Sequence, residues 1–432
     1  MNDVRETGFK ERARLAAARE RLLETSPVQR TERVSLSVAD GRVAAEPVDA
    51  ARNVPHYARA AMDGWAVRAA DTFGASDRSP AALRPADSVA PDAAVRVHTG
   101  SELPDGADAV VKVEAVDEVG GELEVFDAVA EGENVAPVGE DVEAGQRLYD
   151  PGDQLRPSDL GLLKATGLDT VEAVAEPEVA VVPTGEELVQ ADPDPGEVVE
   201  TNRFTVSRLA ERWGADVTRR NIVTDDREAL RAAIERDLTR DVVVTTGGSS
   251  VGERDLVPEV VDELGEVFVH GVALKPGHPV ALGRVDGVTV VMLPGYPVAA
   301  IVNAVQFLRP LVEHLGRMPH QPLPTREATL ARKIRSEPGV RTFVRVRLER
   351  VPQSGTNGSS SAEPSRGPRE DGERTEPRDD DADGLEATPT RASGAGVLSS
   401  VALADGWVVV PERREGIPEG ETVIVENWEH HE

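Results

Sequence analysis

The sequence predicts a multidomain α/β plus β protein, with an α/β domain on a parallel-type sheet and β domains before and after it. The chain has 432 residues, enough for more than one domain. Strand and helix patterns alternate from Glu178 to a long apolar helix expected to begin at Pro297. Short strand patterns separated by turn residues fill the flanking regions. These three observations define the predicted fold class.

The charge balance is strongly acidic. The chain has 78 Asp and Glu residues against 48 Lys and Arg residues, a formal net charge of -30. This excess opposes nonspecific binding to nucleic acid or to an anionic membrane, so neither is expected as a partner. Such a surface suits a cytoplasm at high salt, where screening removes the self-repulsion. We expect a halophilic source; the alternative is an acidic protein without salt adaptation.

Cysteine and targeting signals are both absent. The lack of cysteine excludes disulfides, thiolate metal ligands and cysteine nucleophiles. No apolar run reaches the length of a membrane span, and Met1 to Arg21 is charged throughout, without the apolar segment of a signal peptide. The sequence therefore predicts a cytoplasmic protein.

The N-terminal part begins with an amphipathic helix pattern from Phe9 to Leu23. Turn-rich strand patterns follow, and they predict an all-β module of roughly 90 residues. Asp63, in an Asp-Gly turn, and Thr99 lie on its expected loops. Taken alone, the Asp63 segment is equally consistent with a turn flanked by core residues.

The α/β region contains a glycine-rich strand-loop-helix segment from Asp241 to Asp255. Gly247 and Gly248 allow a ligand to approach the backbone, and the helix start that follows favours an anion. Asp255 at this position would suit a phosphate that arrives with a divalent cation. The segment has neither a Walker pattern nor Gly-x-Gly-x-x-Gly spacing, so ordinary P-loop and dinucleotide sites are disfavoured. A purely structural turn stays open at this point.

Several polar residues follow expected strands of this region. Glu187, Asp225, Asp255 and Pro294 all lie just beyond strand ends. The carboxyl ends of parallel strands share one edge of a sheet, so we expect these residues to lie close together. Asp225 also has a simpler interpretation as a helix N-cap. Lys275, one of few lysines, lies in a Pro/Gly turn and is a candidate functional cation.

The C-terminal region shows strand alternation from Arg341 to Leu348. Residues 352–391 are rich in Ser, Pro, Gly, Asp and Glu, a composition that cannot bury enough apolar surface to order itself. We predict a disordered insert there. Strands are expected to resume at Gly396–Leu398, Gly406–Val410 and Thr422–Val425.

In combination, six motifs resemble the molybdopterin molybdenumtransferase family, which includes MoeA and the gephyrin E domain. The resemblance covers nearly the whole chain apart from residues 352–391. The motifs are Ala61-Met-Asp-Gly-Trp-Ala-Val67, His98-Thr-Gly with Leu103–Val111, Thr184-Gly-Glu-Glu-Leu188, Thr246-Gly-Gly-Ser-Ser-Val-Gly252 with Asp255, Lys275-Pro-Gly-His-Pro279 and Leu293-Pro-Gly-Tyr-Pro-Val298.

The resemblance implies four regions. Residues 1–54 and 141–175 would form a segmented connecting domain I, and residues 55–140 the β domain II. Residues 176–322 would form a MogA-like three-layer α/β domain III. Residues 323–432 would form the C-terminal β domain IV, with the insert at 352–391. Family members are homodimers, so Asp63 and Thr99 would reach the site from the partner subunit.

The resemblance also implies the reaction, in which adenylylated molybdopterin and molybdate give molybdenum cofactor and AMP with the assistance of Mg²⁺. The catalytic set would be Asp63, Thr99, Glu187, Asp225, Asp255 and Lys275, and the metal ligands would be Glu187, Asp225 and Asp255. Substrate would contact Thr246, Gly247, Gly248, Ser249, Ser250, Pro294, Gly295 and Pro297. Molybdate would contact Lys275, His278, Pro279, Arg341, Arg345 and Ser400.

The chain departs from the family pattern at several positions, notably His278 in place of a second lysine, Tyr296 in place of asparagine and Ala395 in place of serine. A titrating imidazole in place of a fixed cation affects oxyanion binding first. Three alternatives therefore stay open: tungstate insertion by the same mechanism, adenylylation of molybdopterin, and a nonenzymatic scaffold.

The acidic surface yields a first prediction. Lowering KCl from molar to millimolar concentration should lower the melting temperature, because repulsion among the excess carboxylates is no longer screened. Thermal unfolding followed by circular dichroism at both concentrations measures this. An unchanged melting temperature would contradict salt adaptation.

Overall fold

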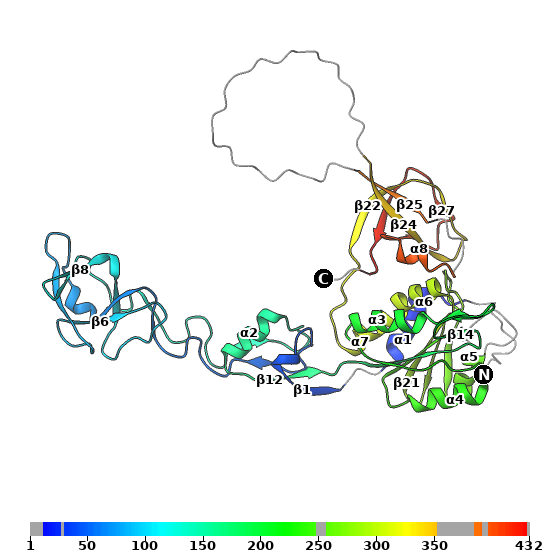
Figure 1. Cartoon of the computed structure of the whole chain (residues 1–432), viewed down its shortest axis with the longest axis horizontal. Helices are drawn as coiled ribbons and strands as arrows, with labels where there is room; N and C mark the ends of the chain where they lie inside the picture. Colours follow the sequence, from blue (N-terminus) through cyan, green and yellow to red (C-terminus); the bar gives the residue numbers. More distant parts are fainter. Residues whose placement is uncertain (1–11, 27–29, 248–255, 352–383, 391–395, 430–432) are drawn as a thin grey trace, which may run out of the picture. The chain divides into compact units, whose positions relative to one another are not determined.

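The computed structural model describes residues 12–26, 30–247, 256–351, 384–390 and 396–429. The chain divides into two compact units, Arg30–Ala175 and a second unit made of Met1–Gln29 with Glu176–Glu432. Figure 1 shows the elements of each. Helix α1 (Leu15–Thr25) belongs to the second unit, where Leu15, Ala18 and Leu22 are buried in the core of the α/β domain.

The unit 30–175 contains a small connecting region and a β module. In the connecting region β1 (Thr31–Ser35) pairs with β12 (Thr170–Val174), and β2 (Val48–Asp49) pairs with β11 (Arg147–Tyr149). Helix α2 (Pro157–Ala165) packs there through the buried Leu163. The 3₁₀ turn η1 (Leu36–Val38) follows β1.

The β module carries a sheet in the order β7-β4-β6-β5-β9-β8 among the described residues. Trp65, Val67, Val111 and Leu123 are buried in its core. Its elements are β3 (Arg59–Ala60), β4 (Gly64–Val67), η2 (Ala69–Thr72), β5 (Ala81–Pro85), β6 (Ala93–Val97), β7 (Ala109–Lys112), η3 (Val113–Ala115), β8 (Val116–Val119), β9 (Glu122–Val125) and β10 (Val135–Ala136).

The α/β domain is built on a sheet in the order β16-β13-β17-β21-β20-β18 within the described residues. The strands from β16 to β21 are parallel, whereas β20 and β18 are antiparallel, so the sheet is mixed and not purely parallel. The strands are β13 (Glu178–Pro183), β16 (Asp216–Arg219), β17 (Val242–Thr246), β18 (Glu266–His270), β20 (Ala281–Val285) and β21 (Val288–Leu293). Short strands β14 (Leu188–Val189) and β15 (Val198–Val199) pair beside it.

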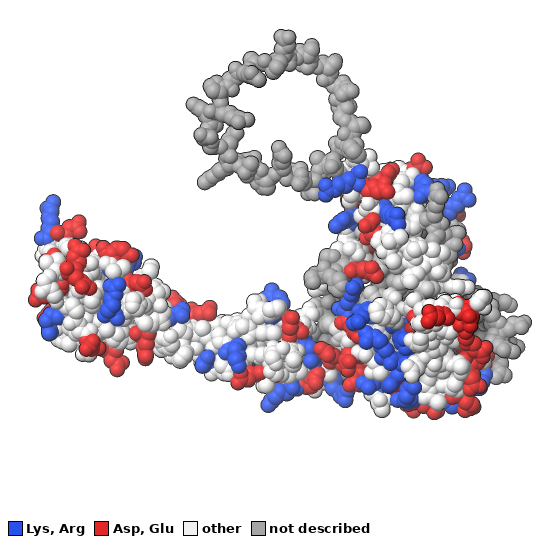
Figure 2. Space-filling view, in the orientation of Figure 1, with Lys and Arg blue, Asp and Glu red and all other residues white. Residues whose placement is uncertain are grey.

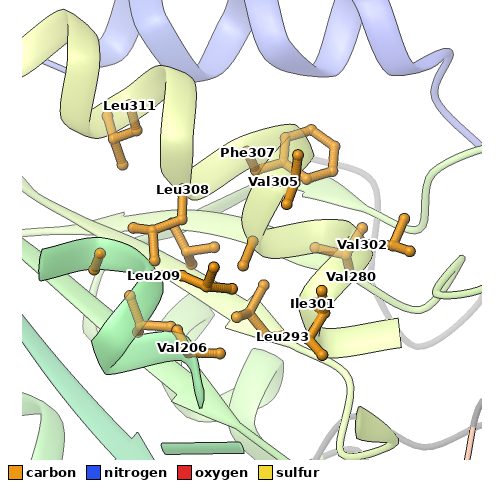
Figure 3. Packing of buried hydrophobic residues seen from close by; sticks show 14 of the residues in the cluster. Val206, Leu209, Val280, Leu293, Ile301, Val302, Val305, Phe307, Leu308 and Leu311 are labelled. Atoms are coloured by element: carbon orange, nitrogen blue, oxygen red, sulfur yellow. The ribbon is translucent and has the colours of Figure 1, made fainter. Parts of the chain in front are cut away.

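Helices cover both faces of this sheet, as expected for three layers. Helices α4 (Arg227–Arg236) and α5 (Leu256–Leu264) share one core with the sheet. The other face carries α1 and α3 (Asn202–Arg212). It also carries one uninterrupted helical stretch made of α6 (Pro297–Asn303), the π-helical η4 (Ala304–Leu308) and α7 (Arg309–Leu315). Figure 3 shows Val206 and Leu209 of α3 packed with Leu293 and Ile301.

The C-terminal β domain contains a sheet in the order β19-β24-β25-β22-β28-β26 among the described residues, with β24 also paired to β26. Strand β19 (Leu274–Lys275) comes from the α/β domain and pairs with the start of β24. The remaining elements are β22 (Thr325–Leu330), β23 (Ile334–Arg335), β24 (Arg341–Val351), β25 (Gly384–Pro389), α8 (Ser399–Ala402), β26 (Gly406–Val410), β27 (Gly416–Ile417) and β28 (Thr422–Glu426).

Two sequence predictions for this domain need correction. Residues 384–389 of the predicted disordered insert form β25, which lies between β24 and β22. Its Ala387 is buried in the core of the C-terminal domain. The polar composition of the preceding residues concealed this short strand, which gains its stability from pairing on both sides. Residues 396–398 do not form a strand, and helix α8 follows them. The rest of the insert, 352–383, lies outside the described residues.

The surface carries both signs of charge. Figure 2 shows basic side chains interspersed with acidic ones on the face that it draws. Many arginines have carboxylate partners, such as Arg227 with Glu259 and Arg414 with Glu421. Within the described residues, no helix combines the length and apolar character needed to cross a membrane.

Strand β25 sets a limit on how much of the insert can be removed. Val351 and Gly384 are paired opposite each other, so a short Gly/Ser turn can join β24 to β25 directly. Deleting residues 354–382 with such a turn should leave the melting temperature within a few degrees. Extending the deletion to residue 390 should lower it strongly, because β22 and β24 lose the strand between them. Equal melting temperatures for both deletions would contradict this role of β25.

Candidate functional site

Three loops meet at the carboxyl edge of the parallel strands. The Thr184 amide after β13 donates to the Thr246 carbonyl at 2.9 Å, and the Gly247 amide after β17 donates to the Leu293 carbonyl at 3.1 Å. A Cβ atom at Gly295 would lie 3.3 Å from the Gly247 Cα. Backbone bonds therefore bring the loops after β13, β17 and β21 together, as the alternation of strands and helices predicts.

Gly247 is required by this close approach. Its φ of +109° is a conformation that other residues rarely adopt. A Cβ there would lie 2.0 Å from the Thr184 carbonyl oxygen, which is far inside contact distance. The predicted neighbours Gly248, Ser249, Ser250 and Asp255 lie outside the described residues.

Glu187 and Asp225 lie beside each other at this edge. Glu187 is exposed in the loop after β13, and Asp225 is half-buried two residues beyond Val223, which forms a β-bridge with Thr184. Burial raises the pKa of Asp225 above its ordinary value, and the charge of Glu187 raises it further, against a hydrogen bond from the Glu186 backbone. The charges of the two carboxylates therefore repel each other.

Asp225 is not used to cap helix α4. The Asp226 carboxylate accepts the Ala229 amide at 2.9 Å, whereas Asp225 Oδ1 is buried and has no hydrogen-bond partner among the described residues. The hydroxyls of Thr184 and Thr246 are also buried, with no partner in the part of the chain that the structure describes. Buried polar atoms without partners cost free energy, so these atoms provide positions where a polar ligand would be stabilised.

The loop Lys275–Pro279 is anchored against helix α6. The Asn303 amide group donates to the Gly277 carbonyl at 3.0 Å and to the Ala299 carbonyl at 2.8 Å. Gly277 has a φ of +107°, and a Cβ there would lie 2.1 Å from the Asn303 side-chain nitrogen. Glycine at this position therefore allows the loop to approach the helix that begins at Pro297.

Two basic side chains of this loop have defined surroundings. The Lys275 ammonium donates to Glu337 Oε1 at 2.8 Å. Burial lowers the pKa of His278, and the charges of Arg12 and Lys275 lower it further, while Glu337 opposes them. The pKa of His278 therefore lies below the ordinary imidazole value of about 6.5.

Arg345 and Ser400 lie together in the C-terminal domain. The guanidinium of Arg345 is buried and donates to Ser400 Oγ at 3.3 Å. Burial lowers the pKa of Arg345. Near α8, a Cβ at Gly396 would lie 3.3 Å from the Tyr296 ring, so the segment before α8 adjoins the Pro294–Pro297 loop.

Arg341 is oriented differently from Lys275. In the parallel pairing of β19 with β24, Lys275 is the partner of Thr342 and Arg341 is the partner of Leu274, which places the two cations on opposite faces. Arg341 forms an ion pair with Glu412 at 3.2 Å and lines a cavity of about 330 Å³ together with Arg19 and Phe343. The structure does not group Arg341 with Lys275.

Asp63 and Thr99 lie together in the β module. Asp63 Oδ1 accepts the Thr99 amide at 2.7 Å and the Thr99 hydroxyl at 2.9 Å, and both residues are exposed. These two hydrogen bonds lower the pKa of Asp63, because they stabilise its ionised form. The loop therefore presents a carboxylate held in one orientation.

Sequence reasoning missed three residues that organise the site. Glu337 contacts Lys275, Asn303 holds the Gly277 carbonyl, and the Asn202 side chain donates to the Gly295 carbonyl at 2.6 Å. Glu337 is separated from its partner by 62 residues, so no local pattern indicated it. An asparagine in an otherwise apolar helix was the signal available for Asn303.

Family models match three segments of the chain. Residues 13–167 match the MoeA N-terminal region (domain I and II), and residues 180–314 match a probable molybdopterin binding domain. Residues 364–428 match the MoeA C-terminal region (domain IV).

Curated relatives agree with these matches. A putative molybdopterin biosynthesis protein of Methanocaldococcus jannaschii is 33% identical over 410 residues, which is 92% of each chain. Molybdopterin molybdenumtransferases of Haemophilus influenzae and Bacillus subtilis are 34% and 33% identical over 55% and 52% of this chain. Those two matches span 62% and 56% of the transferases' own lengths.

Solved structures extend the likeness to three dimensions. A molybdopterin biosynthesis MoeA protein from Pyrococcus horikosii has a TM-score of 0.78 and 32% identity, over 98% of this chain and 100% of that one. A second from Pyrococcus horikoshii OT3 has a TM-score of 0.66 and 27% identity, over 96% of this chain and 99% of that one. Because sequence and structure both match over nearly the whole length, the chain belongs to the MoeA family of molybdopterin biosynthesis proteins.

Proposed function

We propose that this chain is a molybdopterin molybdenumtransferase, which inserts molybdate into adenylylated molybdopterin and releases AMP. The curated relatives that carry this name support the reaction class. The observation that carries the proposal is the meeting of the Thr184, Thr246–Gly247 and Pro294–Gly295 loops beside Glu187 and Asp225. A pyrophosphate-containing substrate fits amides and small residues next to carboxylates that can take a cation.

The carboxylates fit a Mg²⁺ site. Asp225 has a buried oxygen without a partner in the described ranges and a pKa raised by burial and by Glu187, and both features would be relieved by a hard cation with oxygen ligands. Glu187 and Asp225 would hold the ion, with Asp255 as the expected third ligand. When bound, Mg²⁺ would offset the charge that develops as AMP departs. Thr184 and Thr246 would orient the pyrophosphate through their hydroxyls.

The oxyanion substrate needs cations in a protein of strongly negative charge. Lys275, His278 and Pro279 supply one side of the proposed molybdate position, and Arg345 with Ser400 supplies another. Arg341 is the weakest member of the predicted set, because it faces Glu412 and the cavity beside Arg19. Lys275 would then hold the oxyanion by a direct charge-assisted hydrogen bond, whereas Arg345, which shares its face of β24 with Arg341, would contact it only from another side.

The proposal includes a homodimer in the cytoplasm of a salt-adapted cell. In such a dimer Asp63 and Thr99 of one subunit would complete the site of the other, and their mutual hydrogen bonds keep Asp63 oriented for that role. The adenylylation alternative is not favoured, because the match to MoeA proteins extends far beyond the molybdopterin binding domain.

The direct test is incubation with adenylylated molybdopterin, Mg²⁺ and either molybdate or tungstate, following AMP release and cofactor formation. AMP release with molybdate supports the proposal, and preference for tungstate would identify the alternative oxyanion. No AMP release with either oxyanion would overturn it.

Substitutions should separate the metal site from the oxyanion site. Asp225→Ala or Asp255→Ala should lower AMP release by roughly a hundred-fold or more, since both remove a proposed metal ligand. Lys275→Ala should instead raise the molybdate concentration for half-maximal rate by roughly ten-fold. Steady-state kinetics with both substrates varied measures these effects. Full Mg²⁺-dependent activity in Asp255→Ala would contradict its role.

Asp225 and Asp226 should differ in their effects on stability. Asp226→Ala removes the cap of α4 and should lower the free energy of unfolding by about 1 kcal/mol. Asp225→Asn should not lower it at pH 7. Because the folded state raises the pKa of Asp225, ionisation disfavours folding as the pH rises through that pKa, and the amide removes this penalty.

Urea unfolding of both variants measures this difference. Any gain from Asp225→Asn should vanish below the unfolded-state carboxyl pKa of about 3.9, where the group is protonated in both states. A loss of stability in Asp225→Asn as large as that in Asp226→Ala would show that Asp225 is structural.

A further inference from the structure

Lys275 and Glu337 are brought together by the pairing of two domains. Glu337 lies in the turn between β23 and β24, and Lys275 ends β19. The Arg341 amide donates to the Ala273 carbonyl at 2.9 Å, and Lys275 is the register partner of Thr342. Because these backbone contacts hold the start of β24 beside β19, the turn places the Glu337 carboxylate 2.8 Å from the Lys275 ammonium.

Glu337 is surrounded by basic side chains. The hydrogen bond and charge of Lys275 lower its pKa, and the charges of Arg12 and His278 lower it further. The same Arg12, Lys275 and Glu337 act on His278. One carboxylate thus lies among three basic groups, two of which belong to the proposed molybdate position.

We propose that Glu337 is a resident counter-anion that competes with the oxyanion substrate for Lys275, and so sets the oxyanion concentration that the site requires. This inference rests on the function proposed above. A carboxylate and molybdate both accept hydrogen bonds from an ammonium group, and the dianion carries more charge. Occupation by molybdate therefore requires Lys275 to exchange one anionic partner for another.

The pair is suited to exchange because it is exposed. The side chains of Lys275 and Glu337 are 56% and 62% exposed. Exposed ion pairs of this kind shift an equilibrium by no more than about five-fold, and salt screens them. Glu337 therefore holds Lys275 in place and balances its charge when no substrate is bound. The oxyanion displaces Glu337 from Lys275 when it binds.

The test compares Glu337→Gln with wild type in the complete reaction while molybdate is varied. The substitution should lower the molybdate KM by roughly two- to five-fold and leave kcat unchanged, and this difference should shrink as KCl is raised. Glu337→Asp should stay closer to wild type because it keeps the charge. Glu419→Gln is the matched control, since it removes an equal charge from an exposed turn of the same domain.

An unchanged or higher KM in Glu337→Gln would overturn the inference, as would an equal decrease in Glu419→Gln. If the wild-type protein itself releases no AMP, the proposed function fails, and calorimetric titration of molybdate into both proteins tests Glu337 separately. Tighter molybdate binding by Glu337→Gln than by wild type supports competition, and equal or weaker binding overturns it.

Discussion

The hydrogen-bonded edge of strands β13, β17 and β21 is the constraint on which the candidate site depends. Parallel pairing places Pro183, Thr246 and Leu293 side by side, so all three strands end at the same edge of the sheet. The loops that follow these strands must then pass close to one another. Only glycine permits this close approach at position 247. The site is therefore a consequence of strand register as much as of the motifs that line it.

Charge is the second constraint. A protein of net charge -30 has to accept anionic substrates, and several of its cations, Lys275 and Arg341 among them, already have carboxylate partners. The proposed metal would reverse the sign at Glu187 and Asp225, where two carboxylates otherwise destabilise each other. Near Lys275 no metal is needed to reverse the sign of the local charge, because Lys275 and Arg12 outnumber the single carboxylate of Glu337. The two anionic parts of the reaction would thus be handled by opposite kinds of site.

Much of the fold could be predicted because its patterns are local. The alternation of apolar strands and amphipathic helices predicted the α/β domain, and helix α6 begins at Pro297 as expected. Long-range pairing was not accessible in this way. Strand β25 follows a polar segment and becomes a strand only between β24 and β22. The antiparallel pairing of β20 with β21 did have a local signal, the Asp286-Gly287 turn with positive φ at both residues, which the sequence prediction of alternating strands and helices did not use.

The candidate site shows the same division. Motifs indicated Asp63, Thr99, Glu187 and Lys275, and the structure places Asp63 with Thr99 and Asp225 with Glu187. Side-chain direction was beyond the sequence, since Arg341 and Arg345 share one strand but have different partners, Glu412 and Ser400. The alternation of a strand places both on one face, so the difference comes from the elements packed against that face. At residue 345 α8 supplies a hydroxyl, whereas at residue 341 Glu412 supplies a carboxylate. The elements packed against the strand, and not its alternation, therefore decide whether a cation on this face contacts a hydroxyl or a carboxylate.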